Sequence, residues 1–362
     1  MNLRGPIGPV EHKVVRAKFM PTAIVVRAQR VATFGLWWKR HETVGSKTGY
    51  ARDLMKPECV GAIARDYPRF RALLSMPFYM DLLDVCPRLS RQYLTTYLMR
   101  SFDTRERLVA AYHHYRTLHD LPRPAFIPGL LGNGIELWSR EIEGEDYRMV
   151  IKQNVNDHHE GDILLILRRG MKMLFQMSFS LVPGSLIGMR ERNVLFIGSA
   201  QGGKADVEGL RRAIKANEGV APSHLVMAAL RGVAQALGVD GLAGVTDADQ
   251  MTKTRPNYYV FPFDYAAFWP MFGGEKNGRG VFDIPIEAWE KPLTEIPRSH
   301  RRRSRKKREY KAEVTTEIAN ALACYRNTGD VQLAEEKTGL FDMKAVANAP
   351  MQVVSGDVPL PF

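Results

Sequence analysis

Five short segments of β character follow one another between residues 135 and 200, and each is bounded by Gly, Asp, Asn or Pro. The joins between them are tight, as at Glu143-Gly144-Glu145 and at Arg169-Gly170. Short strands with tight joins pair with their neighbours in sequence, so the pattern predicts an antiparallel meander. The predicted strands are 135–140, 147–154, 162–168, 173–181 and 193–200.

The pattern changes after residue 200. The last strand of the meander runs into Gln201-Gly202-Gly203, helices are predicted at 206–217 and 223–237, and a strand follows at 241–246. A strand, helix and strand in this order predict a crossover that places the second strand parallel beside the first. Ser223 is the expected N-cap of the second helix, and Gly238 is its expected stop. A helix at 263–272 and a strand at 281–285 complete the region.

Before the meander, residues 20–122 have helical patterns separated by prolines, which are tolerated in the first turn of a helix and disrupt its interior. Asp103 and Glu106 have the spacing of a capping box at the start of one of these helices. The sequence therefore predicts an α+β protein: a helical amino-terminal region, a mixed sheet flanked by helices over 130–297, and a basic helical segment over 298–325. The ends, 1–19 and 345–362, are predicted to be disordered and loose.

Positive charge is concentrated in one segment. The chain has 51 Lys and Arg against 39 Asp and Glu, a net charge of +12. Residues 298–311 hold nine of those cations and one Glu, a local +8, which leaves +4 for the rest. Such a run attracts phosphates, so an anionic lipid surface or a nucleic acid is the expected partner. The alternatives are a solvated helix face and a clamp on an acidic surface of the protein itself. The candidate anion-binding residues are Arg301, Arg302, Arg303, Arg305, Lys306 and Lys307.

Cysteine and histidine spacing argues against a metal site. Cys59, Cys86 and Cys324 are too few and too far apart for a disulfide framework or a four-cysteine zinc site, and no HxxxH or HExxH pattern occurs. No secretory signal pattern and no stretch of about 20 apolar residues is present. We therefore expect a cytoplasmic protein, or one peripheral to the inner membrane, that binds no metal.

The turn after the last meander strand is the first candidate for chemistry. A Gly-Gly pair between a strand and a helix exposes backbone amides that favour phosphate or pyrophosphate. The alternative is that the glycines only make a tight turn, since neither GxxxxGK[ST] nor GxGxxG is present. The residues that would face the anion are Gly198, Ser199, Gln201, Gly202, Gly203 and Lys204.

Glu160, Tyr259 and Tyr265 are the candidate catalytic residues. A carboxylate with a raised pKa can act as a general base, and a tyrosine hydroxyl at the mouth of a cleft can donate a proton. The alternatives are an exposed turn carboxylate for Glu160 and core packing for the tyrosines.

Several motifs together resemble the VirK/YbjX family of Gram-negative bacteria, over residues 65–315. These motifs are His159-Glu-Gly-Asp-Ile-Leu-Leu165, Leu174–Ser180, Leu195–Gly202, Asp264–Trp269 with Gly273-Gly274, and the His-Tyr segment at 107–115. The chain departs from the family's Thr-Lys…His-Gly-Leu-Arg-Pro run, having Ile214-Lys215…Glu218-Gly-Val-Ala-Pro222 there. The resemblance implies a context of virulence, envelope maintenance and tolerance of cationic antimicrobial peptides, and it leaves the reaction open.

The predicted order of elements is also similar to that of GNAT acetyltransferases. In that fold a diverging parallel strand pair holds the arm of a CoA thioester, and amides after the fourth strand hold its pyrophosphate. The likeness implies an acyltransferase that uses an acyl-CoA and an amine or hydroxyl acceptor, with the parallel strands diverging at the Gly-Gly pair. The rival hypothesis is a non-catalytic accessory protein that binds an anionic lipid or nucleic acid through the basic segment.

Overall fold

The computed structural model describes residues 66–85, 89, 96–119, 126–155, 158–203, 207–251 and 263–325. The chain divides into two compact units, Met1–Arg52 and Asp53–Phe362. Every described residue belongs to the second unit. The ends predicted to be disordered or loose, and the beginning of the predicted helical region, lie outside the described residues.

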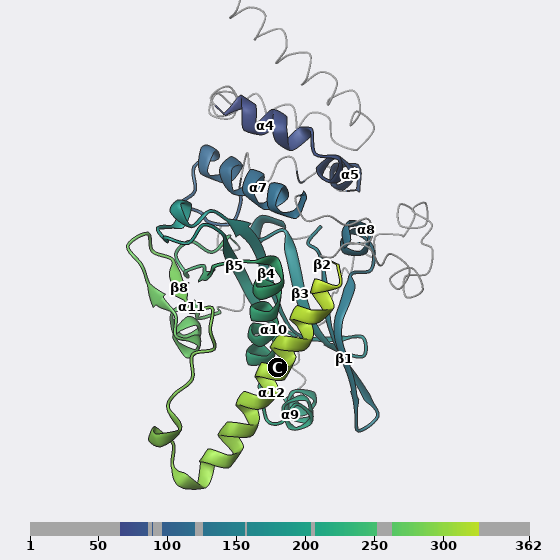
Figure 1. Ribbon diagram of the computed structural model, residues 1–362, viewed down its shortest axis with the longest axis vertical. Coiled ribbons are helices and arrows are strands. Elements are labelled where there is room, and N and C mark those ends of the chain that lie inside the picture. Colours follow the sequence, from purple (N-terminus) through teal and green to yellow (C-terminus); the bar gives the residue numbers. More distant parts are fainter. Residues whose placement is uncertain are drawn as a thin grey trace, which may run out of the picture. The chain divides into compact units, whose positions relative to one another are not determined.

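The second unit is built on one eight-stranded sheet with the order β1-β2-β3-β4-β5-β6-β8-β7 (Figure 1). Each successive pair among the first five strands is antiparallel, so the predicted meander is confirmed. Buried apolar residues on these strands form much of the core. The strands are β1 (Ile135–Ile142), β2 (Glu145–Gln153), β3 (Ile163–Arg169), β4 (Lys172–Val182) and β5 (Val194–Gly202).

The predicted crossover is also confirmed. Strand β6 (Gly241–Gly244) is parallel to β5, and this is the one parallel pair among the described strands. Strand β8 (Phe282–Ile284) pairs antiparallel with β6, and β7 (Glu275–Lys276) lies at the edge. The sequence did not indicate β7, because two residues are too few to display a strand periodicity. The mixed α+β fold class is as predicted.

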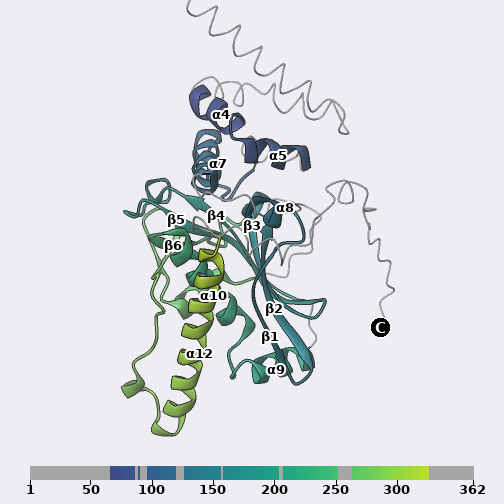
Figure 2. The same cartoon turned by 45° about the vertical axis from the view of Figure 1, so that its right-hand side comes forward.

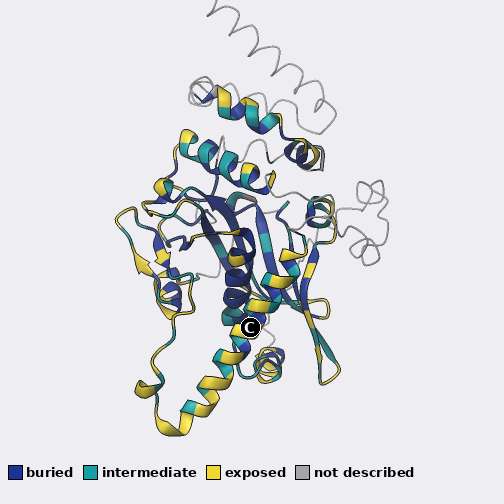
Figure 3. Ribbon diagram, in the orientation of Figure 1, coloured by how far each residue is buried: buried dark blue, intermediate teal, exposed yellow. Residues whose placement is uncertain are grey.

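Two long helices cover the sheet. In both views α12 (Arg298–Ala323) lies over α10 (Pro222–Leu237), which lies over the strands (Figures 1 and 2). Helix α10 is buried along nearly its whole length, whereas the amino-terminal half of α12 is largely exposed (Figure 3). Tyr310, Val314, Ile318 and Leu322 form the buried stripe of α12, at the spacing of one helix face. The basic segment is therefore the start of a helix anchored by its other half.

The capping of α10 differs from the prediction. The helix begins at Pro222, its N-cap is Ala221, and no side chain caps it, so Ser223 is not the N-cap. Proline at the first helical position needs no hydrogen bond from its own nitrogen, which explains the earlier start. The predicted stop is confirmed, since Gly238 adopts a left-handed conformation with φ 64°. Helix α9 (Val207–Ala216) precedes this helix close to its predicted position.

The helical region before the sheet contains α4 (Tyr67–Leu74), α5 (Pro77–Val85), α7 (Thr104–His119) and α8 (Phe126–Leu131). The predicted capping box at the start of α7 is confirmed. The Glu106 amide donates to Asp103 Oδ1 over 2.8 Å, and the Asp103 amide donates to Glu106 Oε2 over 2.9 Å. Helix α7 packs against β4 and carries His114 and Tyr115 to the sheet.

The predicted helix at 263–272 is split into α11 (Tyr265–Phe268) and a 3-10 turn, η4 (Trp269–Phe272). Asp264 caps α11 by accepting a hydrogen bond from the Ala267 amide. Three further 3-10 turns lie within the described residues: η1 (His158–Glu160), η2 (Gly184–Ile187) and η5 (Leu293–Glu295).

Candidate functional site

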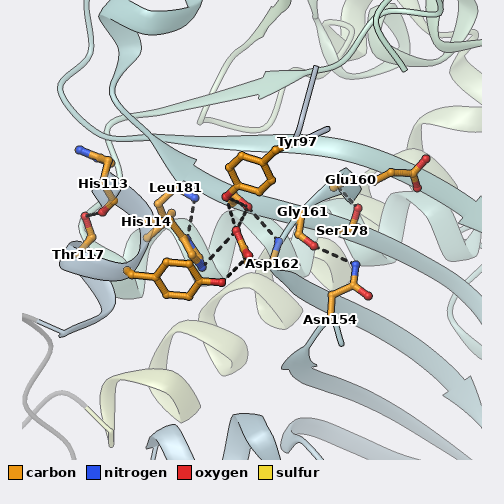
Figure 4. Close-up of polar contacts among 12 residues, drawn as sticks. Tyr97, His113, His114, Thr117, Asn154, Glu160, Gly161, Asp162, Ser178 and Leu181 are labelled. Atoms are coloured by element: carbon orange, nitrogen blue, oxygen red, sulfur yellow. Dashed lines mark hydrogen bonds and ion pairs between the residues drawn. The ribbon is translucent and has the colours of Figure 1, made fainter. Parts of the chain in front are cut away.

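The turn η1 lies tightly against β4 and β5, and its backbone is fixed by hydrogen bonds. Ser178 Oγ donates to the Glu160 carbonyl over 2.8 Å, and Asn154 Nδ2 donates to the Gly161 carbonyl over 2.9 Å (Figure 4). Gly161 has a φ of +143°, which disfavours any residue with a side chain. A Cβ atom on Gly198 would stand 1.9 Å from the Glu160 carbonyl oxygen. The chain therefore holds Glu160 and Asp162 in fixed positions at the start of β3.

Asp162 lies at the centre of a fully buried polar cluster that also contains Tyr97, Tyr115, Ser180 and His114. Three hydroxyls donate to its carboxylate: Tyr115 over 2.6 Å, Ser180 over 2.7 Å, and Tyr97 (Figure 4). Burial, followed by the charge of Asp162, raises the pKa of Tyr115 well above its usual value, so this tyrosine keeps its proton. A buried carboxylate with three hydroxyl donors is satisfied. The cluster therefore fixes α7 and η1 to the sheet.

His114 belongs to the same cluster and is neutral. Burial lowers its pKa, against the opposing effect of Asp162. Its Nδ1 atom accepts the Leu181 amide hydrogen over 3.1 Å, which assigns the ring proton to Nε2. Nε2 faces Asp162 Oδ2 at 3.8 Å. The imidazole thus links a strand amide to the buried carboxylate.

A second polar cluster contains two of the predicted catalytic residues. The side chain of Glu160 is only 8% exposed, and its Oε1 accepts a hydrogen bond from Gln250 Nε2 over 2.7 Å. Tyr265 is also buried, and its hydroxyl accepts the Ala200 amide hydrogen over 3.1 Å. The expectation that Glu160 is an exposed turn carboxylate is wrong, because η1 turns it inward under Gln250.

The ionisation of Tyr265 is strongly perturbed. Burial raises its pKa well above the usual value; the Ala200 amide opposes this shift, Glu160 and Asp247 reinforce it, and a hydrogen bond with Gln250 again opposes it. Glu160, Gln250 and Tyr265 therefore act on one another although they come from η1, the segment after β6, and α11. Gln250 could not be recognised from the sequence, since a lone glutamine in a turn matches no catalytic pattern.

These side chains lie where β5 and β6 separate. The pairing of the two strands runs from Val194 with Gly241 to Ile197 with Gly244, and the Val245 amide makes one more bond to the Ile197 carbonyl. Strand β5 then continues to Gly202 beside β4 alone. The separation begins after Ile197 and not at the Gly-Gly pair, because β6 ends at Gly244.

The residues predicted to face a diphosphate have separate environments. Ser199 Oγ lies 2.7 Å from Ser178 Oγ, and the exposed Gln201 accepts a hydrogen bond from Gln176 over 3.1 Å. Gly202 is exposed at the end of β5, whereas the Gly203 amide donates to the Leu174 carbonyl over 3.0 Å. Lys204 and Tyr259 lie outside the described residues. Diphosphate binding at this turn stays a prediction, and one of its amides is engaged by the sheet.

The predicted anion-binding residues of α12 divide into two groups. Arg301 donates to the Ile296 and Thr294 carbonyls, and Lys306 pairs with Glu218 at 2.8 Å. The other cations form no ion pair or hydrogen bond with any described residue: Arg302, Arg303, Arg305 and Lys307. Neighbouring Arg303 and Lys311 add to the effect of burial in lowering the pKa of Lys307. This second group is therefore not engaged by the other described residues.

Among the described residues, no group of three or more His, Cys, Asp or Glu side chains could hold a metal ion. No helix within the same residues has the length and apolar character needed to cross a bilayer.

Comparison with known proteins gives one family and one curated relative. The family model described as "Protein of unknown function (DUF535)" matches residues 64–320. The uncharacterized protein YbjX of Escherichia coli K12 is 25% identical over 241 residues, which cover 64% of this chain and 72% of YbjX. No solved structure matches the chain.

Proposed function

The chain belongs to the DUF535 family, as its VirK/YbjX motifs predict, and from its own geometry we propose that it transfers an acyl group from a CoA-type thioester to an amine or hydroxyl. One observation carries this proposal. Strand β5 continues past the end of its parallel partner, and Glu160 and Tyr265 meet at that point. The strand order, with its single parallel pair, is similar to the order by which GNAT acetyltransferases hold a thioester arm.

The two side chains have complementary roles. Glu160 takes a proton from the acceptor, the freed lone pair attacks the thioester carbonyl, and the C–S bond breaks. Burial keeps Tyr265 protonated, and because its oxygen accepts the Ala200 amide hydrogen, its own hydrogen can be donated to the leaving thiolate. The raised pKa of Tyr265 makes full proton transfer to a thiolate unfavourable, since thiols ionise near pH 8.5. The sulfur therefore receives the proton that left the acceptor, and the products are an amide or ester and a free thiol.

The test combines binding with turnover. The full chain is incubated with acetyl-CoA, hexanoyl-CoA or palmitoyl-CoA, and thermal unfolding and release of free thiol are measured with lysine or serine as acceptor. At least one thioester should stabilise the protein and release thiol. Glu160→Gln and Tyr265→Phe should each lower the rate about a hundredfold. Tyr310→Phe is the matched control, because it removes a buried hydroxyl that bonds Asn217 outside the site. Absence of both stabilisation and thiol release with every thioester overturns the proposal.

A second function is favoured by a separate observation: two free cations of α12 lie beside the loop that follows α9, and α9 exposes apolar side chains. Gly219, just after α9, lies against Arg303 and Lys307, and α9 itself exposes Val207 (59%) and Leu210 (43%). Cations beside exposed apolar side chains suit an anionic lipid surface better than a nucleic acid. We therefore propose that α9 and α12 dock the protein on anionic lipid.

Vesicle sedimentation tests this docking. The full chain should bind vesicles of 30% phosphatidylglycerol in phosphatidylcholine, and it should not bind pure phosphatidylcholine. Arg302→Glu with Arg305→Glu should abolish binding, whereas Arg190→Glu with Arg192→Glu, exposed cations outside α12, should leave most of it. Lipid docking would be rejected if both double variants lost vesicle binding equally. Tight binding of the protein to duplex DNA without binding to vesicles would also reject it.

A further inference from the structure

A separate cavity of about 240 Å³ lies among α10, η4, the segment 289–296 and α12. It shares no residue with the cluster around Glu160 and Tyr265. Four Lys or Arg side chains and one carboxylate, that of Glu290, contribute to its lining. Lys291 pairs with Glu295, which does not line the cavity, at 3.7 Å. The cations that line the cavity therefore outnumber the carboxylates that pair with them.

The charge of Arg231 is the least compensated of these. Its side chain is only 7% exposed, and its Nε and one terminal nitrogen donate to the Ile286 and Pro285 carbonyls over 3.1 and 3.3 Å. No described carboxylate lies within 4.0 Å of it. Arginine stays charged when buried, and a buried charge without a paired counter-ion is costly. Glu290 and Glu287 favour the charge of Arg231 only at longer range. An anion in the cavity would reduce this cost.

Glu290 compensates the charge of Arg231 only in part, because its carboxylate is shared with two other cations. It pairs with Lys311, and its Oε2 atom lies 3.4 Å from Arg308 Nε. Arg308 also donates to the Lys291 carbonyl. One carboxylate thus holds two cations in position at the wall of the cavity and leaves their summed charge only partly neutralised.

The lining also contains aromatic side chains. The ring of His224 lies against Phe272, with 4.9 Å between centroids, and Trp289 is 54% exposed. Burial, followed by the charge of Lys311, lowers the pKa of His224, so the imidazole is neutral at pH 7 and can still donate one hydrogen bond. An exposed tryptophan beside a cationic cavity provides a flat surface on which a ring can stack.

We propose that this cavity binds a small organic phosphate, with the phosphate against Arg231, Arg308 and Lys311 and a planar group on Trp289. A phosphate monoester suits the site better than a carboxylate because it carries close to two negative charges and three acceptor oxygens. The cavity volume is below the usual range of pockets that hold drug-sized ligands, so the ligand must be a compact molecule. The site does not depend on the acyl transfer proposed above.

Calorimetric titration of the full chain tests the assignment, with phenyl phosphate as the probe and inorganic phosphate, benzoate and benzyl alcohol as comparisons. Phenyl phosphate should bind saturably and most tightly, inorganic phosphate should bind more weakly, and benzyl alcohol should not bind. Arg231→Met should weaken phenyl phosphate about tenfold. Trp289→Ala, a change at an exposed side chain, should weaken phenyl phosphate about fivefold and leave inorganic phosphate unchanged.

Arg302→Gln is the matched control, because Arg302 is an exposed cation of α12 that does not line the cavity. It should leave the affinity for phenyl phosphate unchanged. Absence of saturable phenyl phosphate binding overturns the proposal, and so does an equal loss in Arg302→Gln, which would indicate general attraction. Benzoate binding as tight as that of phenyl phosphate would overturn the assignment to phosphate.

Discussion

His114 Nε2 lies 3.8 Å from Asp162 Oδ2, and neither side chain is exposed to solvent. The imidazole is neutral because burial lowers its pKa, and its Nδ1 atom is occupied by the Leu181 amide. The ring thus bonds α7 to β4 and lies beside the buried carboxylate that precedes β3. The contribution of His114 to the stability of the fold depends on the imidazole staying uncharged.

Acid should therefore destabilise the protein before the carboxylates titrate. The folded-state pKa of His114 lies below the unfolded value of 6.5, so below pH 6.5 the unfolded state takes up the proton more readily. The free energy of unfolding should be highest above pH 6.5 and should fall as pH drops from there toward the folded pKa. The slope is at most about 1.4 kcal/mol per pH unit for one such group.

Urea unfolding at pH 7.5, 6.5 and 5.5 measures this effect. Burial also lowers the pKa values of His113 and His224, so they add to it in the same direction. His114→Asn keeps an acceptor for the Leu181 amide and should reduce the pH dependence. An unchanged pH dependence in that variant would exclude His114 as a source.

Removing one hydroxyl from the Asp162 cluster should leave the buried carboxylate short of a donor. Tyr115→Phe should lower the free energy of unfolding by about 1–3 kcal/mol, and Asp162→Asn should make the loss of the Tyr115 hydroxyl less costly. A double-mutant cycle by urea unfolding measures this coupling. Tyr112→Phe on the same helix is the control, with an expected change of about 0.5 kcal/mol or less, since its hydroxyl bonds only the exposed Arg116. If the two substitutions had additive effects on the free energy of unfolding, the Tyr115 hydroxyl would not stabilise the Asp162 carboxylate.

The close approach of η1 to β5 should make Gly198 intolerant of substitution. In Gly198→Ala the new Cβ would stand 1.9 Å from the Glu160 carbonyl oxygen, so η1 must move and about 1–3 kcal/mol should be lost. Gly202→Ala in the same strand is the control, since its Cβ would meet nothing closer than 4.0 Å. Thermal unfolding of the two variants compares them. Equal melting temperatures would contradict the close approach.

The two helix starts predicted from sequence should respond differently to alanine. Asp103→Ala should cost about 1 kcal/mol, because Asp103 caps α7. Ser223→Ala should change stability by about 0.5 kcal/mol or less, because α10 begins at Pro222 and no side chain caps it. Urea unfolding of both variants checks the difference. A larger cost for Ser223→Ala would contradict the observed start of α10.

The elements that could be predicted from sequence are those whose cause is local. The capping box needs only residues 103–106, and the meander needs only alternating strands with short joins. The parallel pairing of β5 and β6 could also be predicted from the sequence, because a helical crossover between two strands permits few alternatives. The residue at which β5 and β6 separate could not be predicted. It depends on where β6 ends, and β6 is two residues shorter than the predicted strand.

The candidate site was predicted only in part for a similar reason. Glu160 and Tyr265 could be named as residue types able to move protons, but their shared partner Gln250 could not. Likewise, the basic character of 298–311 was plain in the sequence, whereas the division between engaged Arg301 and Lys306 and the free cations depends on neighbouring loops.

The sequence by itself determined the order of strands and helices, the α+β class and the location of the basic segment, because periodicity, caps and turns act over a few residues. The tertiary structure alone decided which side chains meet. Glu160 and Gln250 are 90 residues apart and Tyr265 and Ala200 are 65 apart, and each pair forms only after the sheet has closed around the crossover. Burial of these groups, which sets their pKa values and their possible chemistry, is a property of that packing and is absent from the linear chain.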